Sequence, residues 1–462
     1  MNLKSTSKTK FTTEPGREVT QDACRLCSPL GACLAFKGVE GAVTILHGSQ
    51  GCATYIRRYL ISHFREPIDV ASTSFTEETA VFGGKSNLLA GLDNVSRQYS
   101  PQLIGVATTC LSETIGDDVA AVLRDRVPAN PEETCKVLNV STPSYCGSHA
   151  DGFYRAVRSL VTSLTEPAHE TFNRRLNVFP GMASPADLRW LKRVLKDFGL
   201  EATVLPDYSD TLDGGLWSSY ERIPSGGTTL EAIRAMGSSE CSLEFGHALN
   251  PLDSAAVWLE ENRGVKRLLT GAPLGVAASD LFFHRLQALT GCDFPAELQA
   301  ERGRLIDAYA DGHKYVSGKR AAVYGEADLV ATLALFLLEI GVIPVLCAAG
   351  GPVNAFRDVM KGLVPDLEER GMEIMSDADF DHIEQATARI GVDFMIGNSK
   401  GYKAAKRLGV PLVRVGFPIH DRFGAARNRL MGYEGTQRLF DDLVNTLLSH
   451  NQEASGLGYS YM

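Results

Sequence analysis

The sequence predicts an α/β protein in which parallel sheets are flanked by helices. Short apolar runs rich in β-branched residues recur along the chain, and helix-length amphipathic segments separate them. Because two parallel strands need a crossover of a dozen or more residues between them, this alternation favours βαβ units. The strand-like runs lie at residues 43–46, 103–109, 137–140, 176–179, 202–205, 265–270, 320–324, 343–347, 393–397 and 412–415.

The clearest single unit spans residues 319–350. A strand ends at Gly325, a helix with apolar Leu329, Leu333 and Leu337 follows, and the chain then returns as the next strand. This pattern is typical of one Rossmann-like repeat.

Chain length and breaks in the pattern divide the sequence into three expected domains. A chain of 462 residues exceeds the size at which one hydrophobic core keeps growing. A helix opening at Ser184 and a polar helix near 303–318 suggest three sheets. We expect a flexible N-terminus over 1–20 and α/β domains over 21–165, 166–305 and 306–462, with a last helix that packs back.

Composition and charge exclude several classes of partner. With 44% hydrophobic and 22% charged residues the chain is globular. Its net charge of -9 opposes general nucleic-acid binding, which needs clustered Lys and Arg. The polar opening residues lack the apolar core of a secretory signal, and no uninterrupted apolar stretch of about 18 residues follows. We therefore expect a cytoplasmic protein with no nucleic-acid partner and no membrane contact.

The cysteines concentrate in the first third of the chain. The ten cysteines stand at positions 24, 27, 33, 52, 110, 135, 146, 241, 292 and 347. A disulfide framework is not expected, because the cytosol keeps thiols reduced and a core this large needs no cross-links. Any cysteine chemistry therefore belongs to the N-terminal third.

Three of these cysteines fall on turns that lead into helices. Cys52 ends the string HGSQGC between a strand-like and a helix-like segment, and Cys110 directly follows the strand at 103–109. Cys27 precedes Pro29 and Gly31, which force a tight bend before a helix. Ligands bind at the carboxyl ends of parallel strands, where Cys110 is placed.

The residue pattern alone leaves three interpretations open for these thiols. Three thiolates beside backbone amides suit an iron–sulfur cluster. Each could instead be a small, inert buried residue, which is the common fate of a free cysteine. A structural zinc site is weakly indicated, because only Cys24 and Cys27 have CxxC spacing and no second pair follows.

A resemblance to a known family favours the cluster. The strings CSPLGA, HGSQGC, HFREP, TEETAVFGGKSN, TTCLSETIGDD and TPSYCGSH, in this order and spacing, resemble the β subunit of molybdenum-iron nitrogenase and its relatives. The likeness continues through GGTTLEAIRAMG, GAPLGVAASD, VYGEADL, DFMIGNSKG and VRVGFPIHDRFG, and so covers nearly the whole chain after about residue 20. It implies three Rossmann-like domains, of which the one at 21–165 binds the cluster.

The resemblance also assigns residues to roles. It implies that Cys27, Cys52 and Cys110 are the β-side ligands of an eight-iron P-cluster of the [8Fe–7S] type. It places Ser49 close to that cluster, and Ser144 matches a serine that can ligate oxidised iron, the alternative being a turn serine. Tyr55 matches a residue between the cluster and the active-site cofactor. Phe82 matches an aromatic residue where a reductase docks, the alternative being a core phenylalanine.

The family further implies the partners and the function. The P-cluster would be shared with a homologous α-type subunit in an α2β2 heterotetramer, and the active-site metallocluster would sit on that α-type subunit. ATP and a [4Fe–4S] cluster would belong to a homodimeric, Fe-protein-like reductase. This chain would relay electrons between the two as a β-type oxidoreductase subunit, active in the αβ complex.

Several other signals are expected to be structural. The string Gly83-Gly-Lys-Ser86 resembles the end of a P-loop, but Thr79 stands where the first P-loop glycine belongs. His47, His63 and His149 lie near the cysteine motifs and are more often hydrogen-bonded structural histidines than ligands. Asp117 and Asp118 are expected on a solvated helix face.

Departures from the dinitrogen-fixing pattern bear on the substrate. Cys24 and Cys146 are additional cysteines that could be auxiliary ligands, and residues 421–436 resemble the cofactor-assembly scaffold and nitrogenase-like branches. The preferred hypothesis is reductive carbon–sulfur cleavage of methylthio-alkanes. The alternatives are a true dinitrogenase β subunit and a cofactor-assembly scaffold subunit.

Overall fold

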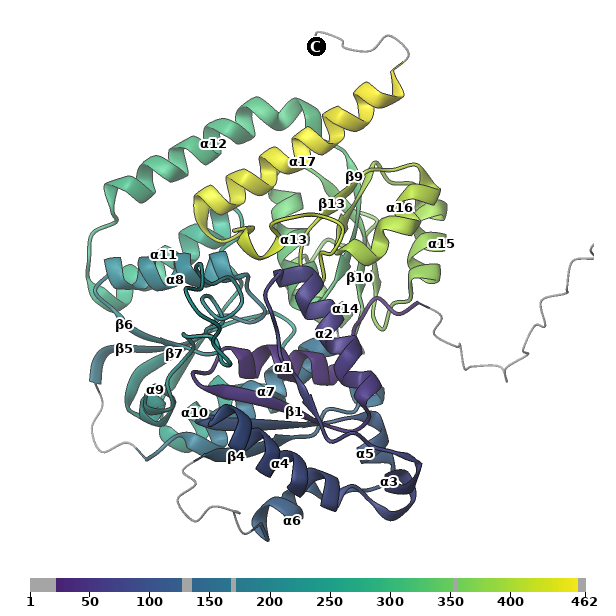
Figure 1. The fold of residues 1–462 in the computed structure, drawn as a ribbon. Helices are drawn as coiled ribbons and strands as arrows, with labels where there is room; N and C mark the ends of the chain where they lie inside the picture. Colours follow the sequence, from purple (N-terminus) through teal and green to yellow (C-terminus); the bar gives the residue numbers. More distant parts are fainter. Residues whose placement is uncertain (1–21, 127–134, 168–171, 352–355, 456–462) are drawn as a thin grey trace, which may run out of the picture.

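Three parallel sheets form the framework of the protein (Figure 1). The structure is a computed structural model that describes residues 22–126, 135–167, 172–351 and 356–455, so the segment expected to be flexible, 1–20, lies outside it. Every strand pairing in the described residues is parallel. The predicted α/β class with three sheets is confirmed.

The strands of the three sheets follow one another along the sequence. The first sheet, in the order β2-β1-β3-β4, contains Ala71–Ser72, Ala42–His47, Leu103–Thr108 and Lys136–Val140. The second, β6-β5-β7-β8, contains Glu201–Val204, Phe172–Phe179, Ser239–Phe245 and Lys266–Thr270. The third, β11-β10-β9-β12-β13, contains Glu373–Met375, Ile343–Ala349, Arg320–Gly325, Phe394–Gly397 and Leu412–Arg414.

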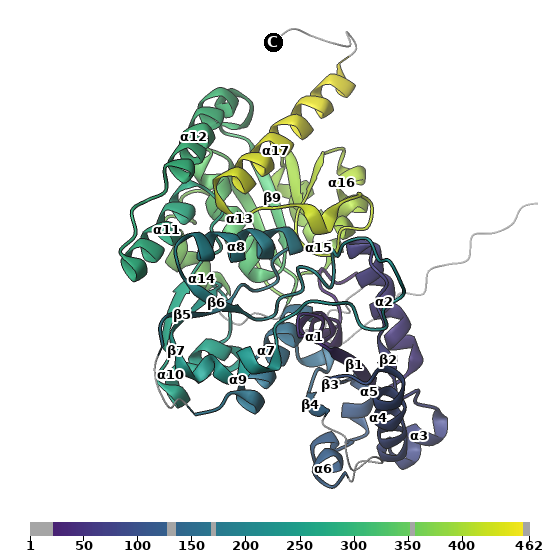
Figure 2. The same ribbon diagram turned by 60° about the vertical axis from the view of Figure 1, so that its left-hand side comes forward.

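Helices cover both faces of these sheets (Figure 2). In the first third they are α1 Ser28–Lys37, α2 Gln50–Phe64, α3 Glu77–Phe82, α4 Lys85–Tyr99, α5 Cys110–Thr114, α6 Val119–Arg124 and α7 His149–Leu164. In the middle they are α8 Pro185–Asp197, α9 Leu230–Arg234, α10 Ala255–Arg263, α11 Val276–Thr290 and α12 Ala296–Val316. In the last third they are α13 Ala327–Glu339, α14 Phe356–Leu363, α15 Phe380–Ile390, α16 Tyr402–Leu408 and α17 Gly432–Ala454. None of the described helices is long and apolar enough to cross a membrane.

Each sheet contains one strand that was not among the expected runs: β2 in the first, β7 in the second and β11 in the third. Strand β7 pairs with both β5 and β8 and is almost fully buried. Its sequence, SECSLEF, alternates polar with apolar residues and has no apolar run. The polar positions are stabilised inside the protein, because buried Glu244 forms an ion pair with Arg267 at 2.7 Å.

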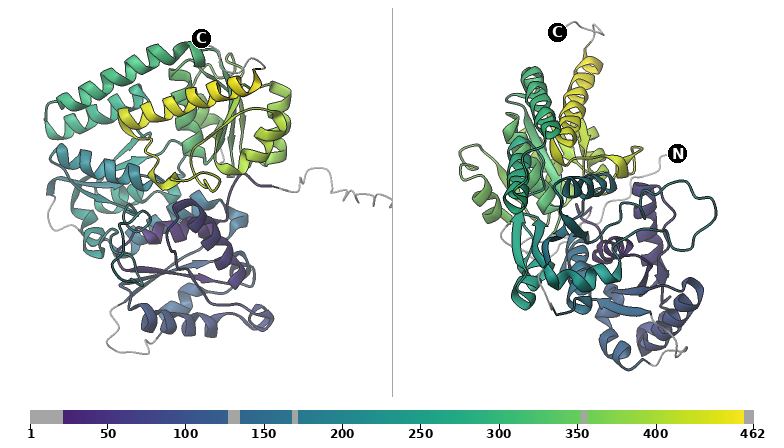
Figure 3. Two further views of the ribbon diagram at one scale, coloured as in Figure 1. Left: turned by 45° about the horizontal axis from the view of Figure 1, so that its top comes forward. Right: turned by 90° about the vertical axis from the view of Figure 1, so that its left-hand side faces the viewer.

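Helices and a short N-terminal segment join the three domains. Helix α17 lies along α12 (Figure 3), so the last helix extends from the third domain back over the second. Helix α7 packs on α1 in the first domain and on α10 in the second. Asp22–Cys24 pairs with the third domain, where Cys24 N–H donates to the Ala378 carbonyl at 3.0 Å. The expected boundaries near 165 and 305 stay predictions.

Candidate metal-cluster site

Cys27 is fixed at the start of α1 by close packing of that helix on α7. It is the N-cap residue of α1, with φ -63° and ψ 140°. Leu26 N–H donates to His149 Nδ1 at 3.3 Å, and His149 N–H donates back to the Leu26 carbonyl at 3.0 Å. The helices approach so closely that a Cβ on Gly31 would lie 1.7 Å from the His149 carbonyl oxygen, and one on Gly152 would lie 1.9 Å from that of Ser28. Only glycine fits at these two crossing positions.

Cys52 lies in the first turn of α2, directly after the carboxyl end of β1. Ser49 is the N-cap residue of this helix, and its hydroxyl lies 3.6 Å from Cys52 Sγ. The turn packs tightly on the neighbouring β3–α5 turn, since a Cβ on Gly48 would lie 2.1 Å from Thr109 Oγ1. This close approach brings the Cys52 and Cys110 turns together.

Cys110 opens α5 at the carboxyl end of β3 and is hydrogen-bonded to the segment that follows β4. The Ser144 backbone N–H donates to Cys110 Sγ at 3.2 Å. The Ser144 hydroxyl accepts from the Ser28 N–H at 3.1 Å. Ser144 therefore connects the Cys110 turn with the residue that follows Cys27. It does so as the first residue of the 3-10 turn Ser144–Cys146, after Pro143.

The three thiols lie at one end of the first sheet and all are free. Burial is the largest influence on Cys27 and raises the pKa of its thiol, while the hydrogen bond with Ser144 lowers that pKa. The neighbouring Cys110 and Cys52 thiols raise it further, so each of these two thiols lies near Cys27. Cys27 and Cys52 are half-buried and Cys110 is exposed, so the group opens to the surface.

This arrangement fits a multinuclear cluster better than a single ion. In the part of the chain that the structure describes, no three His, Cys, Asp or Glu side chains gather closely enough to hold one metal ion. A cluster of several irons needs thiols spaced around its edges, together with backbone N–H groups that point at its sulfides. The cysteines at the starts of α1, α2 and α5 supply both features.

Tyr55 lies on α2 beside this group. Its ring packs on Tyr59, with 4.7 Å between ring centroids. Burial, followed by the nearby Cys27 thiol, raises the pKa of the Tyr55 phenol well above its usual value. Tyr55 is therefore a neutral hydrogen-bonding group beside Cys27 at ordinary pH.

Phe82 is not a core residue, so that alternative is wrong. Its side chain is 83% exposed and Val81 beside it is 74% exposed, at the end of the short helix α3.

The expectation of a solvated helix face is also wrong for Asp117. Its carboxylate accepts from His47 Nε2 at 3.1 Å and from the Gly84 N–H at 2.9 Å. Asp118 instead caps α6.

The other candidate residues are placed away from the thiol group or are structural. Cys24 is buried in the core of the third domain, and burial raises the pKa of its thiol to about 12. It therefore does not join the other cysteines. Buried His63 accepts from the Ile419 N–H at 2.9 Å, and burial lowers the pKa of its imidazole to about 3. Cys146 is exposed and lies two residues beyond Ser144.

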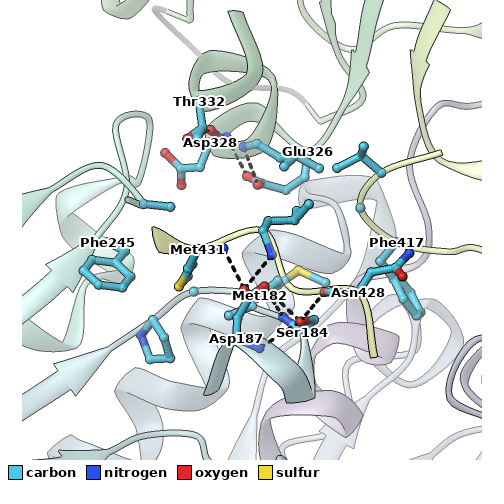
Figure 4. A pocket seen from close by; sticks show the side chains of 18 of the residues that line it. Met182, Ser184, Asp187, Phe245, Glu326, Asp328, Thr332, Phe417, Asn428 and Met431 are labelled. Atoms are coloured by element: carbon cyan, nitrogen blue, oxygen red, sulfur yellow. Dashed lines mark hydrogen bonds between the residues drawn. The ribbon is translucent and has the colours of Figure 1, made fainter. Parts of the chain in front are cut away.

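A second feature, which the sequence analysis missed, is a cavity of about 150 Å³ between the domains (Figure 4). It lies where β5, β7 and β9 end, and its lining includes Met182, Phe245, Glu326 and Phe417. Ligand-binding crevices form at the carboxyl ends of parallel strands, and this rule applied to the second and third sheets could have found it. No cysteine lines the cavity within the described residues.

Comparisons with known proteins agree with this architecture. The family described as Nitrogenase component 1 type Oxidoreductase matches residues 27–448. The chain is 36% identical over 425 residues to the nitrogenase molybdenum-iron protein beta chain of Clostridium pasteurianum, with 92% of each chain covered. It is 36% identical over 454 residues to the beta chain of Methanothermobacter marburgensis, with 95% and 97% covered. The solved structure of nitrogenase Cp1 at pH 6.5 matches with a TM-score of 0.91 and 34% identity over 98% of both chains.

Together, the fold and these relatives define an oxidoreductase subunit built from three parallel-sheet domains. The chain belongs to the nitrogenase component 1 family, and its similarity to beta chains over nearly its whole length makes it a β-type member.

Proposed function

We propose that this chain is the β-type subunit of a nitrogenase-family reductase and holds half of an interfacial [8Fe–7S] P-cluster. The observation that carries the proposal is the meeting of three free thiols, each at the start of a different helix, at one end of the first sheet. The group is open on the side of Cys110, where a homologous α-type subunit would supply the remaining ligands. In solution the assembly would be a cytoplasmic α2β2 heterotetramer.

In this proposal each residue near the thiols has a separate task. Cys27, Cys52 and Cys110 hold the cluster as thiolates, and Ser144 keeps the Cys27 and Cys110 turns together. Its hydroxyl oxygen accepts the Ser28 N–H and has a second lone pair, through which it could ligate oxidised iron. The Ser49 hydroxyl lies within reach of the Cys52 sulfur. The bound cluster would supply reversible electron storage.

The proposed partners are the protein that would donate electrons to this chain and the subunit that would accept them. An ATP-dependent, Fe-protein-like homodimer carrying a [4Fe–4S] cluster would dock at exposed Phe82, since a projecting aromatic side chain is typical of an interface anchor. Tyr55 would lie on the path toward the active-site metallocluster of the α-type subunit. This chain would bind and orient the cluster and shield it from water. Bonds of the substrate would be broken on the α-type subunit.

For the substrate, we propose small methylthio-alkanes, whose carbon–sulfur bonds would be cleaved reductively. The support is the C-terminal segment 421–436 and exposed Cys146, in which this chain departs from the dinitrogen-fixing pattern. Cys24 no longer supports it, because this thiol lies in the third domain. The second candidate is reduction of dinitrogen to ammonia, favoured by the names of the beta-chain relatives.

A paired assay distinguishes these functions. The anaerobically purified αβ complex is supplied with the reductase, ATP and a strong reductant, and methanethiol from ethyl methyl sulfide and ammonia from dinitrogen are measured in parallel. We expect thiol release with little or no ammonia. Ammonia without thiol would make the chain a dinitrogenase β subunit. Absence of both products with full iron content would identify a cofactor-assembly scaffold.

A further inference from the structure

A pair formed by buried His47 and half-buried Asp117 connects the segment that carries Phe82 with the strand end that precedes Cys52. His47 is the last residue of β1 and is 1% exposed, and its Nε2 lies 3.1 Å from Asp117 Oδ2. Burial lowers the pKa of this imidazole, and the tautomer that pairs with a carboxylate is the one that donates through Nε2–H. Both Asp117 oxygens accept the Gly84 N–H, at 3.1 and 2.9 Å. Gly84 follows Phe82 by two residues.

The turn at Gly83 and Gly84 has little room to move against this pair. Gly83 has a φ of 89°, and a Cβ placed on it would lie 3.1 Å from Asp117 Oδ1. A Cβ on Gly84 would lie 2.3 Å from the Phe75 ring and 2.7 Å from Asp117 Oδ2. Phe75 in turn packs edge-on against the His47 ring, with 4.8 Å between centroids. These contacts explain why two glycines stand here.

The same histidine is bonded through its backbone to the Cys110 turn. Its carbonyl accepts from the Thr109 N–H at 3.2 Å and from the Thr109 hydroxyl at 3.0 Å, and Thr109 is the N-cap residue of α5. On the other side, Gly48 N–H donates to Thr73 Oγ1 at 3.0 Å, which fixes the turn that leads to Cys52. His47 thus contacts the turns of two thiols and, through Asp117, the turn of Phe82.

We propose that His47 and Asp117 are positioning residues that couple the surface at Phe82 to the Cys52 and Cys110 turns. The inference rests on the proposed function of both regions. A reductase that displaces the Phe82 turn would displace the Gly84 N–H, and with it Asp117 and the His47 ring. Because interfaces and packed cores have discrete arrangements, such a shift would be transmitted to the Thr109 and Gly48 contacts rather than absorbed.

The test measures reductase affinity, electron transfer and iron content in the complete αβ complex. The variants are Asp117→Ala, which removes the link, and Asp117→Asn, which keeps one carbonyl oxygen for the Gly84 N–H. Asp118→Asn is the matched control, since this adjacent carboxylate bonds only to the Ala121 N–H among the described contacts of its side chain. Affinity is measured by anaerobic titration without turnover, and electron transfer in a single turnover at saturating reductase.

We expect Asp117→Ala to retain its iron, to weaken reductase binding about five- to tenfold, and to slow electron transfer even at saturation. Asp117→Asn should have a reductase affinity and an electron-transfer rate between those of Asp117→Ala and the native protein. In a Phe82→Ala background, Asp117→Ala should change the affinity no further, because it acts through Phe82. If the role of Asp117 were purely structural, Asp117→Ala would weaken reductase binding further in the Phe82→Ala background.

The outcomes separate this inference from the proposed function. If Asp117→Ala and Asp117→Asn match Asp118→Asn in affinity and electron-transfer rate while Phe82→Ala weakens binding, the coupling is overturned and docking stands. If Phe82→Ala itself leaves binding unchanged, the proposed docking surface is wrong. Loss of iron in both Asp117 variants would make the pair a support of the thiol turns and would also overturn the coupling.

Discussion

Cys27, Cys52 and Cys110 differ from the other cysteines in the surroundings of their sulfur atoms. Each lies at the start of a helix, near backbone N–H groups that have no intrahelical partner. Cys347, by contrast, is fully buried, and burial raises the pKa of its thiol to about 12. Local position on a turn, more than the number of cysteines, therefore separates the three thiols that we propose as ligands from thiols in the core.

The first residue-scale prediction concerns these ligands. Replacing Cys27, Cys52 or Cys110 by Ala should remove or degrade the cluster, because each replacement removes one of its thiolate ligands. The site should also become less stable, since cluster binding is coupled to its folding. Iron per αβ pair, measured after anaerobic purification, checks this. Cys241→Ala and Cys292→Ala serve as controls and should retain full iron. Unchanged iron in Cys52→Ala would contradict the assignment.

A second prediction at this scale concerns docking. Phe82→Ala should weaken reductase binding by about 2 kcal/mol, or roughly thirtyfold, because a central aromatic anchor carries that much of an interface. Turnover at limiting reductase concentration measures the effect, and iron content should stay unchanged. Leu252 is similarly exposed, at 74%, on the second domain, and Leu252→Ala is the control. Equal turnover in both variants would show that Phe82 is neutral.

Individual residues also show how far the sequence alone could lead. The turn positions of the three thiols could be predicted, since glycine and proline mark such turns locally. The Ser28–Ser144 bond and the His47–Asp117 pair could not, because each joins segments far apart in the chain, by 116 and 70 positions respectively. For the same reason Asp117 was expected on a solvated face.

At the scale of elements, the crossing of α1 and α7 determines where Cys27 lies. We predict that Gly31→Ala or Gly152→Ala will destabilise the subunit by about 1–3 kcal/mol or more, because the added methyl groups overlap backbone atoms. Iron content should fall although no ligand is changed. Thermal unfolding together with iron analysis measures both effects.

The control for this prediction lies in another helix. Gly303 is exposed in α12, and a Cβ there would meet nothing within 4 Å. Gly303→Ala should therefore be neutral or stabilise by up to about 1 kcal/mol through helix propensity. If Gly31→Ala behaves like Gly303→Ala, the close helix crossing does not position Cys27.

The elements themselves were predictable to different degrees. The unit from β9 through α13 to β10 agrees with the sequence analysis, because its strands are continuous apolar runs buried on both faces. Strand β7 was missed because ion pairing and hydrogen bonding allow Glu244 and Ser242 to be buried. The alternation of polar with apolar residues in SECSLEF is itself typical of a strand and could have predicted β7.

At the scale of the whole molecule, Glu326 in the cavity between the domains makes the stability of the protein depend on pH. Burial, followed by the charge of Asp328, raises the pKa of Glu326 from 4.5 to about 8. The stabilising contribution of the neutral acid is therefore fully present below about pH 4.5 and is lost as pH rises through about 8. Burial lowers the pKa of His149 to about 4 and that of His63 to about 3. These two groups therefore reduce the stability only as pH falls below about 6.5.

The corresponding prediction uses a neutral replacement. Glu326→Gln should flatten the decline in thermal stability of the complex between about pH 7 and about pH 9, whatever its effect at neutral pH. Melting temperatures measured across this range provide the test. Glu326 is the N-cap residue of α13, and Glu339→Gln, which removes the carboxylate at the other end of this helix, is the control. Parallel pH profiles for the native protein and Glu326→Gln would contradict the assignment.

The pairing of Asp22–Cys24 with the third domain has a consequence for the biogenesis of the subunit. The Asp22 N–H donates to the Asp379 carboxylate at 2.8 Å across a sequence separation of 357 residues. During synthesis, the segment leading into Cys27 leaves the ribosome 357 residues before this partner and can pair with it only after the third domain has been made. We therefore expect the chain to receive iron only after the segment at Asp22 has paired with the folded third domain.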